Sequence, residues 1–136
     1  MSFRKPIEVV QLYVQAFNQG QTEKMLSYLD EEVEHNINQG RTEIGIMAFT
    51  KFMSHMDNCY KEQLKDLVFL SSDNSNRVAV EFTVQGRYLK TDGSLPEAKG
   101  QEYKINAGSF FEVKEGKISR VTTYYNLPLW IEMVKT

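Results

Sequence analysis

The feature that most restricts the fold is a strict alternation of side chains at residues 78–85. Valine or phenylalanine occupies every even position, and the odd positions carry small or polar residues. Because the side chains of a strand point to opposite faces in turn, this run predicts a strand with one buried and one exposed face. Residues 103–113 and 118–125 are two further long strands, which the turn at Glu115–Gly116 joins into a hairpin. The second half of the chain is therefore predicted to form an antiparallel sheet.

The first half of the chain has mainly helical periodicity. Apolar residues recur at helical spacing from Pro6 to the Asn18–Gly20 segment, and again from Phe49 to Met56. Two more helices are expected: a short one capped by Thr22, which carries Met25, Leu26 and Leu29, and a C-terminal one capped by Asn126. Further strands are expected at residues 33–38 and 63–70, a turn at 71–76 and a loop at 91–100. Three helices followed by antiparallel strands predict an α+β fold, in which a curved sheet wraps around the helices.

Length and charge limit the classes of protein that remain. We expect residues 1–136 to form a single domain, because a chain of this length can bury its own core. The formal net charge is −2 and there is no basic run, so the pattern of a nucleic-acid binder is missing. No apolar stretch reaches the roughly 20 residues of a membrane-spanning helix, and the N-terminal residues do not resemble a signal peptide. Since the single cysteine, Cys59, fits a reducing compartment, we expect a soluble cytoplasmic protein.

The segment from Val33 to Gly45 is where we expect a functional site. It runs from a strand through a polar turn into the third helix, and it contains one of the two histidines, His35. Strand alternation places Val33, His35 and Ile37 on one face and Asn36 on the other. An imidazole is suited to proton transfer near neutral pH, but His35 can share a pocket with Asn36 only if a β-bulge intervenes. The alternative is that His35 packs beneath the third helix or at a subunit interface.

Three segments resemble the ketosteroid isomerase-like (SnoaL-like) group of the cone-shaped NTF2-like fold. They are QLYVQAFNQGQ at Gln11–Gln21, YLDEEVEHNINQG at Tyr28–Gly40 and INAGSFFEVKEGKISRVTTYYN at Ile105–Asn126. The INQG of Ile37–Gly40, with Glu43, Gly45 and the closing Tyr124–Asn126, resembles a subgroup called ketosteroid isomerase-related. The resemblance covers nearly the whole chain. It implies a cone-shaped, cystatin-like fold with an internal pocket, no cofactor, and a homodimer paired through the outer sheet face that carries Glu81, Thr83, Gln85 and Arg87.

The resemblance also implies roles for individual residues. In the isomerases a tyrosine of the first helix donates a hydrogen bond to the enolate oxygen, and Tyr13 stands at that place. A carboxylate on the first strand moves the proton, and counting from Asp30 leads to Asn36. The second oxyanion donor is a protonated carboxylic acid, where this chain has Ser109. Because an amide does not accept a proton at neutral pH and a serine is a weaker donor than a carboxylic acid, classical steroid isomerisation is not expected.

Further pocket residues follow from Ser109, because alternate residues of a strand share a face. The predicted substrate-binding residues are Tyr103, Ile105, Phe111, Val121, Thr123, Tyr125 and Trp130. For Trp130, closure of the pocket mouth and simple packing are equally good interpretations. A pocket that is mostly apolar, with a few hydroxyls, suits a flat hydrophobic molecule that carries one or two oxygens.

Other kinds of site have no support in the sequence. Two distant histidines without a carboxylate at matched spacing do not indicate a metal site. Cys59 shows no His–Asp arrangement for nucleophilic catalysis, and we expect His55 at the surface. Three functions stay open: cofactor-free proton transfer on a small hydrophobic carbonyl compound, non-catalytic binding of such a compound, or structural dimerisation. For the first, the candidate catalytic residues are Tyr13, His35, Asn36 and Ser109.

Overall fold

The structure is a computed structural model that describes residues 2–73 and 76–135. The described residues form α1 (Pro6–Asn18), α2 (Thr22–Leu26), β1 (Leu29–Asn36), β2 (Thr42–Ile44), α3 (Ile46–Cys59), β3 (Tyr60–Ser71), β4 (Arg77–Tyr88), β5 (Glu102–Lys114), β6 (Lys117–Tyr125) and α4 (Leu127–Val134). The turn expected at residues 71–76 includes Asn74 and Ser75, which lie outside the described residues. Within the described part of the chain, no helix is both long enough and apolar enough to cross a membrane.

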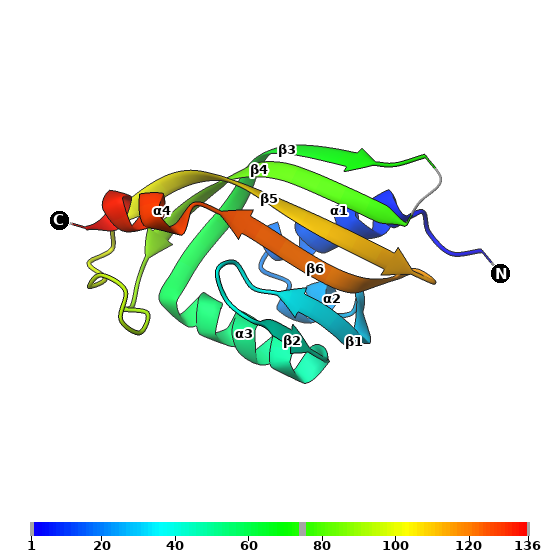
Figure 1. Cartoon of the computed structure of the whole chain (residues 1–136), viewed down its shortest axis with the longest axis horizontal. Coiled ribbons are helices and arrows are strands. Elements are labelled where there is room, and N and C mark those ends of the chain that lie inside the picture. The colour runs from blue at the N-terminus through cyan, green and yellow to red at the C-terminus, as the bar shows by residue number, and fades with distance from the viewer. Residues whose placement is uncertain (1, 74–75, 136) are drawn as a thin grey trace.

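The strands form one sheet in the order β2-β1-β6-β5-β4-β3. Neighbouring strands are antiparallel except for β1 and β6, which run parallel. The sheet is curved and unclosed, with α1 behind its long strands and α3 below β1 and β2 (Figure 1). The α+β fold with a curved sheet wrapped around helices is thereby confirmed. The parallel β1–β6 pair is an exception to the expected antiparallel sheet, because strand alternation carries no information on which strands become neighbours.

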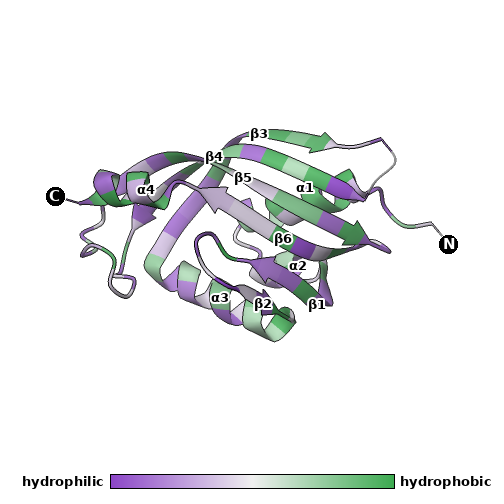
Figure 2. Ribbon diagram, in the orientation of Figure 1, coloured by the Kyte–Doolittle hydropathy of each residue, from purple (hydrophilic) through white to green (hydrophobic). Residues whose placement is uncertain are grey.

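The core lies between α1 and the concave face of the sheet. Pro6 begins α1 at a position where a missing N–H is no loss, and Gly20, at a φ of 70°, allows the chain to turn after the helix. The even-numbered residues of β4 are buried from Val78 to Tyr88, as alternation predicts. Figure 2 shows the change between hydrophobic and hydrophilic residues along this strand. Full burial of an aliphatic or phenylalanine side chain stabilises the fold by about 1.5–3 kcal/mol. The buried residues that α1 contributes are Val9, Val10, Tyr13, Val14 and Ala16.

The ends of several elements differ from the sequence-based expectations. α2 ends at Leu26, so Leu29 begins β1 instead of extending the helix. The segment expected as a polar turn contains the short strand β2, which pairs with β1. β3 begins at Tyr60, directly after α3 and earlier than the expected residue 63. Consequently Glu62 belongs to a strand of the sheet, and this position decides its role in the site.

Candidate functional site

The concave side of the sheet encloses a cavity of about 600 Å³, within the range of small-molecule sites. Its wall is mainly apolar and is formed by the inner faces of the strands together with α1 and α3. All the pocket residues that the sequence predicts lie at this wall, with the exception of Asn36. They are Tyr13, His35, Tyr103, Ile105, Ser109, Phe111, Val121, Thr123, Tyr125 and Trp130. The structure therefore brings these side chains together, while their roles in binding or catalysis stay predictions.

Asn36 is turned away from the cavity. Its amide nitrogen donates a hydrogen bond to the Thr122 hydroxyl at 2.8 Å, and its amide oxygen accepts one from the Thr42 hydroxyl at 2.6 Å. Asn36 thus ties β1 to its neighbours β6 and β2. The structure therefore does not bring Asn36 to the cavity with the other candidate catalytic residues. Counting from Asp30 along the family pattern led to the residue that follows the inward-facing His35.

His35 has the inward position on β1. The strand keeps its alternation here, so no bulge is needed to bring the imidazole to the cavity. The ring also packs beneath α3, with centroid distances of 4.5 Å to Phe49 and 4.7 Å to Phe52. Burial lowers the pKa of His35, and the negative charge of Glu43 opposes only part of that effect, so the imidazole is neutral at neutral pH. Among the described residues, its Nδ1 atom has no hydrogen-bond partner.

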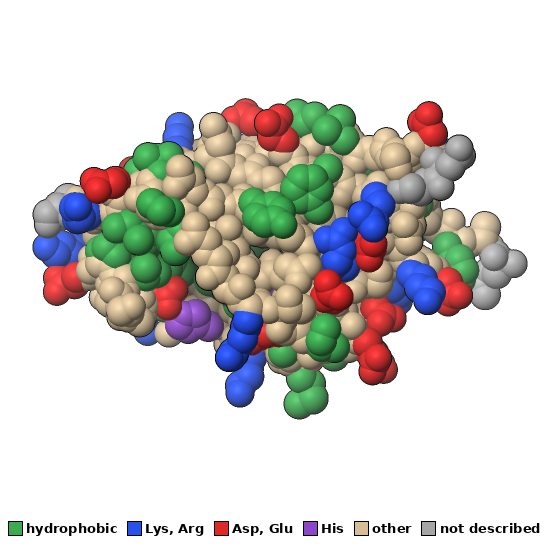
Figure 3. Space-filling model, viewed as in Figure 1, with side chains coloured by type: hydrophobic (Ala, Val, Ile, Leu, Met, Phe, Trp, Pro, Cys, Tyr) green, Lys and Arg blue, Asp and Glu red, His purple; other side chains and the backbone are tan. Residues whose placement is uncertain are grey.

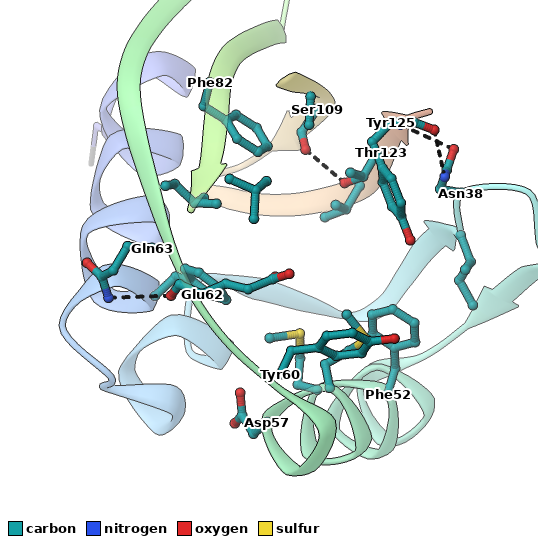
Figure 4. Close-up of a pocket in the computed structure, with 18 of the residues that line it drawn as sticks. Asn38, Phe52, Asp57, Tyr60, Glu62, Gln63, Phe82, Ser109, Thr123 and Tyr125 are labelled. Carbon is teal, nitrogen blue, oxygen red and sulfur yellow. Dashed lines mark hydrogen bonds between the residues drawn. The ribbon is translucent and has the colours of Figure 1, made fainter. Parts of the chain in front are cut away.

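Two sets of hydroxyl groups can donate hydrogen bonds to a ligand in the cavity. Burial raises the pKa of the Tyr13 hydroxyl, which therefore keeps its proton, and no described residue is its hydrogen-bond partner. The hydroxyls of Ser109 and Thr123 lie 2.8 Å apart on directly paired residues of β5 and β6 (Figure 4). Their mutual hydrogen bond uses only one of the two hydroxyl protons. The other proton can be donated to a ligand oxygen.

Glu62 is a functional candidate that the sequence analysis missed. Its side chain extends from β3 toward the middle of the pocket (Figure 4), and the Tyr103 hydroxyl donates a hydrogen bond to its Oε2. Glu62, Gly86 and Tyr103 are direct neighbours across β3, β4 and β5. A Cβ atom added at Gly86 would lie 2.5 Å from Cζ of Tyr103. The absence of a side chain at Gly86 is therefore what allows the Tyr103 ring to reach the carboxyl group.

Burial raises the pKa of Glu62, and the hydrogen bond from Tyr103 offsets only part of this rise. The hydroxyl of Tyr103 donates its hydrogen bond to Oε2. The other carboxyl oxygen, Oε1, has no hydrogen-bond partner among the described residues. A carboxyl group with a raised pKa holds and releases a proton closer to neutral pH than an ordinary glutamate. The sequence contains a pattern that could have indicated Glu62. If the strand begins at Tyr60, alternation places Tyr60, Glu62 and Leu64 on the same face of the sheet.

Trp130 of α4 packs at one end of the cavity. Its ring lies against those of Tyr88, Tyr103 and Tyr60, with centroid distances of 5.0, 5.7 and 5.8 Å. The side chain is buried. Of the two interpretations offered for Trp130, these contacts support packing, and they help to fix the Tyr103 ring beside Glu62.

At the end of α3, three groups meet that the sequence analysis treated separately. His55 Nε2 lies 2.7 Å from Asp92 Oδ1 and 4.0 Å from Cys59 Sγ. The expectation that His55 is a surface residue is correct, but the expectation that Cys59 has no His–Asp neighbour is wrong. Asp92 comes from the distant loop between β4 and β5, so spacing could not indicate it. Burial and the charge of Asp92 raise the pKa of the Cys59 thiol, which argues against a nucleophile.

Comparison with known proteins identifies a family and close structural relatives. The SnoaL-like domain family matches residues 10–121. A solved candidate polyketide cyclase from Xanthomonas campestris pv. campestris is 46% identical, with a TM-score of 0.93, and the alignment covers 96% of this chain and 97% of that one. A second one, from Silicibacter sp. TM1040, is also 46% identical, with a TM-score of 0.95 and coverage of 100% and 99%.

A more distant structure shares the fold alone. An NTF2-like protein of unknown function from Burkholderia pseudomallei is 14% identical, with a TM-score of 0.82 and coverage of 98% of this chain and 100% of that one. The expected NTF2-like fold is thereby confirmed. Curated proteins yield no match.

Proposed function

This chain belongs to the SnoaL-like domain family, and from that premise we propose that it catalyses a cofactor-free proton transfer, of the isomerase or cyclase type, on a small hydrophobic carbonyl compound. Similarity to candidate polyketide cyclases supports this reaction class. The mainly apolar cavity of about 600 Å³ suits a flat compound of a few rings with one or two oxygens.

The observation that carries the proposal is the carboxyl group of Glu62 inside an apolar cavity. A general base is most effective when its pKa lies near the working pH, and burial moves the pKa of Glu62 in that direction. The Tyr103 hydroxyl donates to Oε2 and leaves Oε1 without a partner among the described residues, and Glu62 lies at the cavity wall. Glu62 thus supplies the proton acceptor that Asn36 cannot be.

The proposed reaction begins when Glu62 Oε1 removes a proton from a carbon next to the substrate carbonyl. The electron pair of that C–H bond forms the C=C bond of an enolate, and the carbonyl oxygen gains the negative charge. Tyr13 and the Ser109–Thr123 pair donate hydrogen bonds to this oxygen, as groups that stabilise an oxyanion do. Glu62 then returns the proton to a different carbon in an isomerisation. In a cyclisation, the enolate carbon attacks a second carbonyl of the same molecule, and Glu62 returns the proton to the resulting alkoxide.

We assign a positioning contact to His35. Its neutral imidazole lies at the cavity wall with Nδ1 lacking a partner among the described residues. A buried polar atom without a hydrogen-bond partner costs free energy. A second polar group on the substrate would form a hydrogen bond with Nδ1 and remove this cost. His35 would therefore favour compounds with more than one oxygen.

A titration with flat phenols tests the proposed oxyanion donors, because a bound phenolate resembles the enolate. We expect saturable binding that shifts the phenol toward its ionised form, followed by the ultraviolet absorption of the phenol itself. Tyr13→Phe should weaken this binding about tenfold or more, since a hydrogen bond to a charged group is worth about 1.5–3 kcal/mol.

Tyr124→Phe is the matched control for Tyr13→Phe, because Tyr124 is exposed and lies outside the cavity wall. This variant should bind phenols as the wild type does. Binding without ionisation, and without any effect of Tyr13→Phe, would favour a non-catalytic binding protein. A protein that binds no member of the panel would favour a structural module.

We also propose a homodimer that forms through the outer face of the sheet. Leu70, Ala79 and Phe110 are direct neighbours across β3, β4 and β5, and the Phe110 ring lies 5.9 Å from that of Tyr124 on β6. Leu70, Phe110 and Tyr124 are exposed. Figure 3 shows hydrophobic side chains gathered on the sheet face turned toward the viewer. Exposed apolar patches of this kind are typical of protein–protein interfaces.

Phe110→Glu should convert the dimer into a monomer, because each copy would place a carboxylate in the apolar interface. The mass in solution, measured by sedimentation equilibrium over a range of concentrations, tests this. Met47→Glu is the matched control, since Met47 is 83% exposed on α3, away from the patch, and should leave the dimer intact. A monomeric wild type, or a dimer that survives Phe110→Glu, would contradict the proposal.

A further inference from the structure

We propose that His55, Cys59 and Asp92 form a binding site for one divalent cation of the zinc type. This site does not depend on the proton-transfer chemistry proposed for the cavity. It reverses the expectation, drawn from sequence spacing alone, that the chain has no metal site.

The three ligand atoms lie close enough together for one ion to contact all of them. His55 Nε2, Cys59 Sγ and an Asp92 carboxylate oxygen all lie within 4.8 Å of one another. His55 and Cys59 are four residues apart on α3 and therefore share one face of the helix. An ion with bonds of about 2.0–2.3 Å to nitrogen, oxygen and sulfur requires only small side-chain movements to join them.

The surroundings of Asp92 already hold its carboxylate in place. The Tyr60 hydroxyl donates a hydrogen bond to Asp92 Oδ2 at 2.7 Å, which leaves Oδ1 directed at His55. The backbone N–H of Asp92 donates to the Tyr88 hydroxyl at 2.9 Å, and that hydroxyl donates to the Pro96 carbonyl at 2.7 Å. Hydrogen bonds that orient the ligands are a regular feature of protein metal sites. An ordinary ion pair between His55 and Asp92 at the surface would not need these hydrogen bonds from Tyr60 and Tyr88 to hold the carboxylate in place.

The donor set selects the type of ion. One thiol, one imidazole and one carboxylate suit zinc and similar transition metals, whereas magnesium and calcium prefer oxygen ligands alone. The Cys59 side chain is buried, while the His55 side chain is 52% exposed and gives the ion a path from solvent. Binding releases the thiol proton of Cys59. The Nε2 proton that His55 donates to Asp92 moves through solvent to Nδ1, so that Nε2 and the Asp92 carboxylate can each form a bond to the metal. With three protein ligands, the fourth position is left to water.

The consequence of binding is a link between α3 and the loop that follows β4. His55 and Asp92 both lie at the wall of the cavity, together with Leu89 and Leu95 of the same loop region. An ion held between them would fix this loop against the end of α3. The cation would therefore make the rim of the cavity more rigid, and it would take no part in the proton transfer itself.

Cobalt(II) is a suitable probe, because a thiolate bound to Co²⁺ absorbs in the near ultraviolet and a tetrahedral site gives strong visible bands. We expect one Co²⁺ per chain with both signals, displaced by one equivalent of Zn²⁺. Zinc should also raise the midpoint of thermal unfolding in a concentration-dependent way. His55→Gln, Asp92→Asn and Cys59→Ser should each weaken binding by more than the roughly 10- to 100-fold effect of losing an outer hydrogen-bond partner.

Glu97→Gln is the matched control, because Glu97 is an exposed acidic residue of the same loop that pairs only loosely with Lys99, at 3.9 Å. It should bind both metals as the wild type does. His55→Gln changes a half-exposed side chain and is expected to fold even if Cys59→Ser does not. The proposal is overturned if the wild type shows no saturable binding, if Co²⁺ binds without a thiolate absorption band, or if His55→Gln leaves the affinity unchanged.

Discussion

Glu62→Gln is expected to lower the rate of proton transfer by about 100- to 10,000-fold, the contribution that a positioned general base makes. An amide cannot accept the proton, but it keeps the size of the side chain and an oxygen that accepts the hydrogen bond from Tyr103. The loss should therefore fall on the chemical step and leave ligand binding nearly unchanged. The measurement is the rate of α-proton exchange of a bound carbonyl compound, compared with its affinity.

Glu81→Gln provides the matched control, because Glu81 is an exposed glutamate on β4, a direct neighbour of Gly108 on β5, outside the cavity wall. Its rate should equal that of the wild type. The pH dependence gives a second check. The base is active only as the carboxylate, so the wild-type rate should fall as pH decreases through the raised pKa of Glu62. Equal rates for Glu62→Gln and the wild type would remove Glu62 from the mechanism.

The same pKa shift has a consequence for stability. A carboxyl group whose pKa is raised by folding favours the folded state at low pH, and this contribution is lost as pH rises through the folded-state pKa. Glu62→Gln should therefore be at least as stable as the wild type at neutral and alkaline pH. A fall in activity without a fall in stability separates a catalytic role from a structural one.

Gly86→Ala is expected to reduce the free energy of unfolding by about 1–3 kcal/mol, the usual cost of overpacking. The added Cβ would lie 2.5 Å from Cζ and from the hydroxyl oxygen of Tyr103, so the ring must move and its hydrogen bond to Glu62 must lengthen or break. Activity should fall together with stability. Chemical denaturation of the variant, with the exchange rate measured in parallel, tests both effects.

Two comparisons make the Gly86 prediction specific. Gly108→Ala is the matched control, because a Cβ there would meet its nearest neighbour, the Val80 carbonyl oxygen, at an ordinary 3.6 Å. It should change stability little. Tyr103→Leu removes the atoms with which the new Cβ collides, so Gly86→Ala should cost much less in that background. If Gly86→Ala costs the same with and without Tyr103→Leu, the explanation through ring contact is incorrect.

Local patterns of side chains predicted the architecture well. The alternation along β4 and the hairpin of β5 and β6 indicated both the antiparallel part of the sheet and the set of inward residues from Tyr103 to Tyr125. The position of His35 followed from the same rule, since strand alternation placed it opposite Asn36. Counting along a family pattern led instead to Asn36, on the other face, because a shift of one residue exchanges the faces of a strand.

The features that the sequence did not predict depend on contacts between distant segments. Glu62 meets Tyr103 only through the register of three strands and only because Gly86 leaves room between them. Asp92 reaches His55 only through the path of a long loop. The end of α3 at Cys59 lacks a glycine or proline signal, so the start of β3 was expected too late. In each case the information lies in tertiary contacts, which periodicity does not record.

If residues of the cavity transfer a proton to and from carbon, the protein should catalyse the exchange of that proton for deuterium. A panel of flat aryl ketones and β-diketones would be incubated with the protein in D₂O and followed by proton NMR. We expect protein-dependent loss of the α-proton signal for at least one bound compound, a loss that is retained in Glu81→Gln and abolished in Glu62→Gln. If bound compounds exchange no faster than in buffer, or if Glu62→Gln exchanges as fast as the wild type, the claim is contradicted.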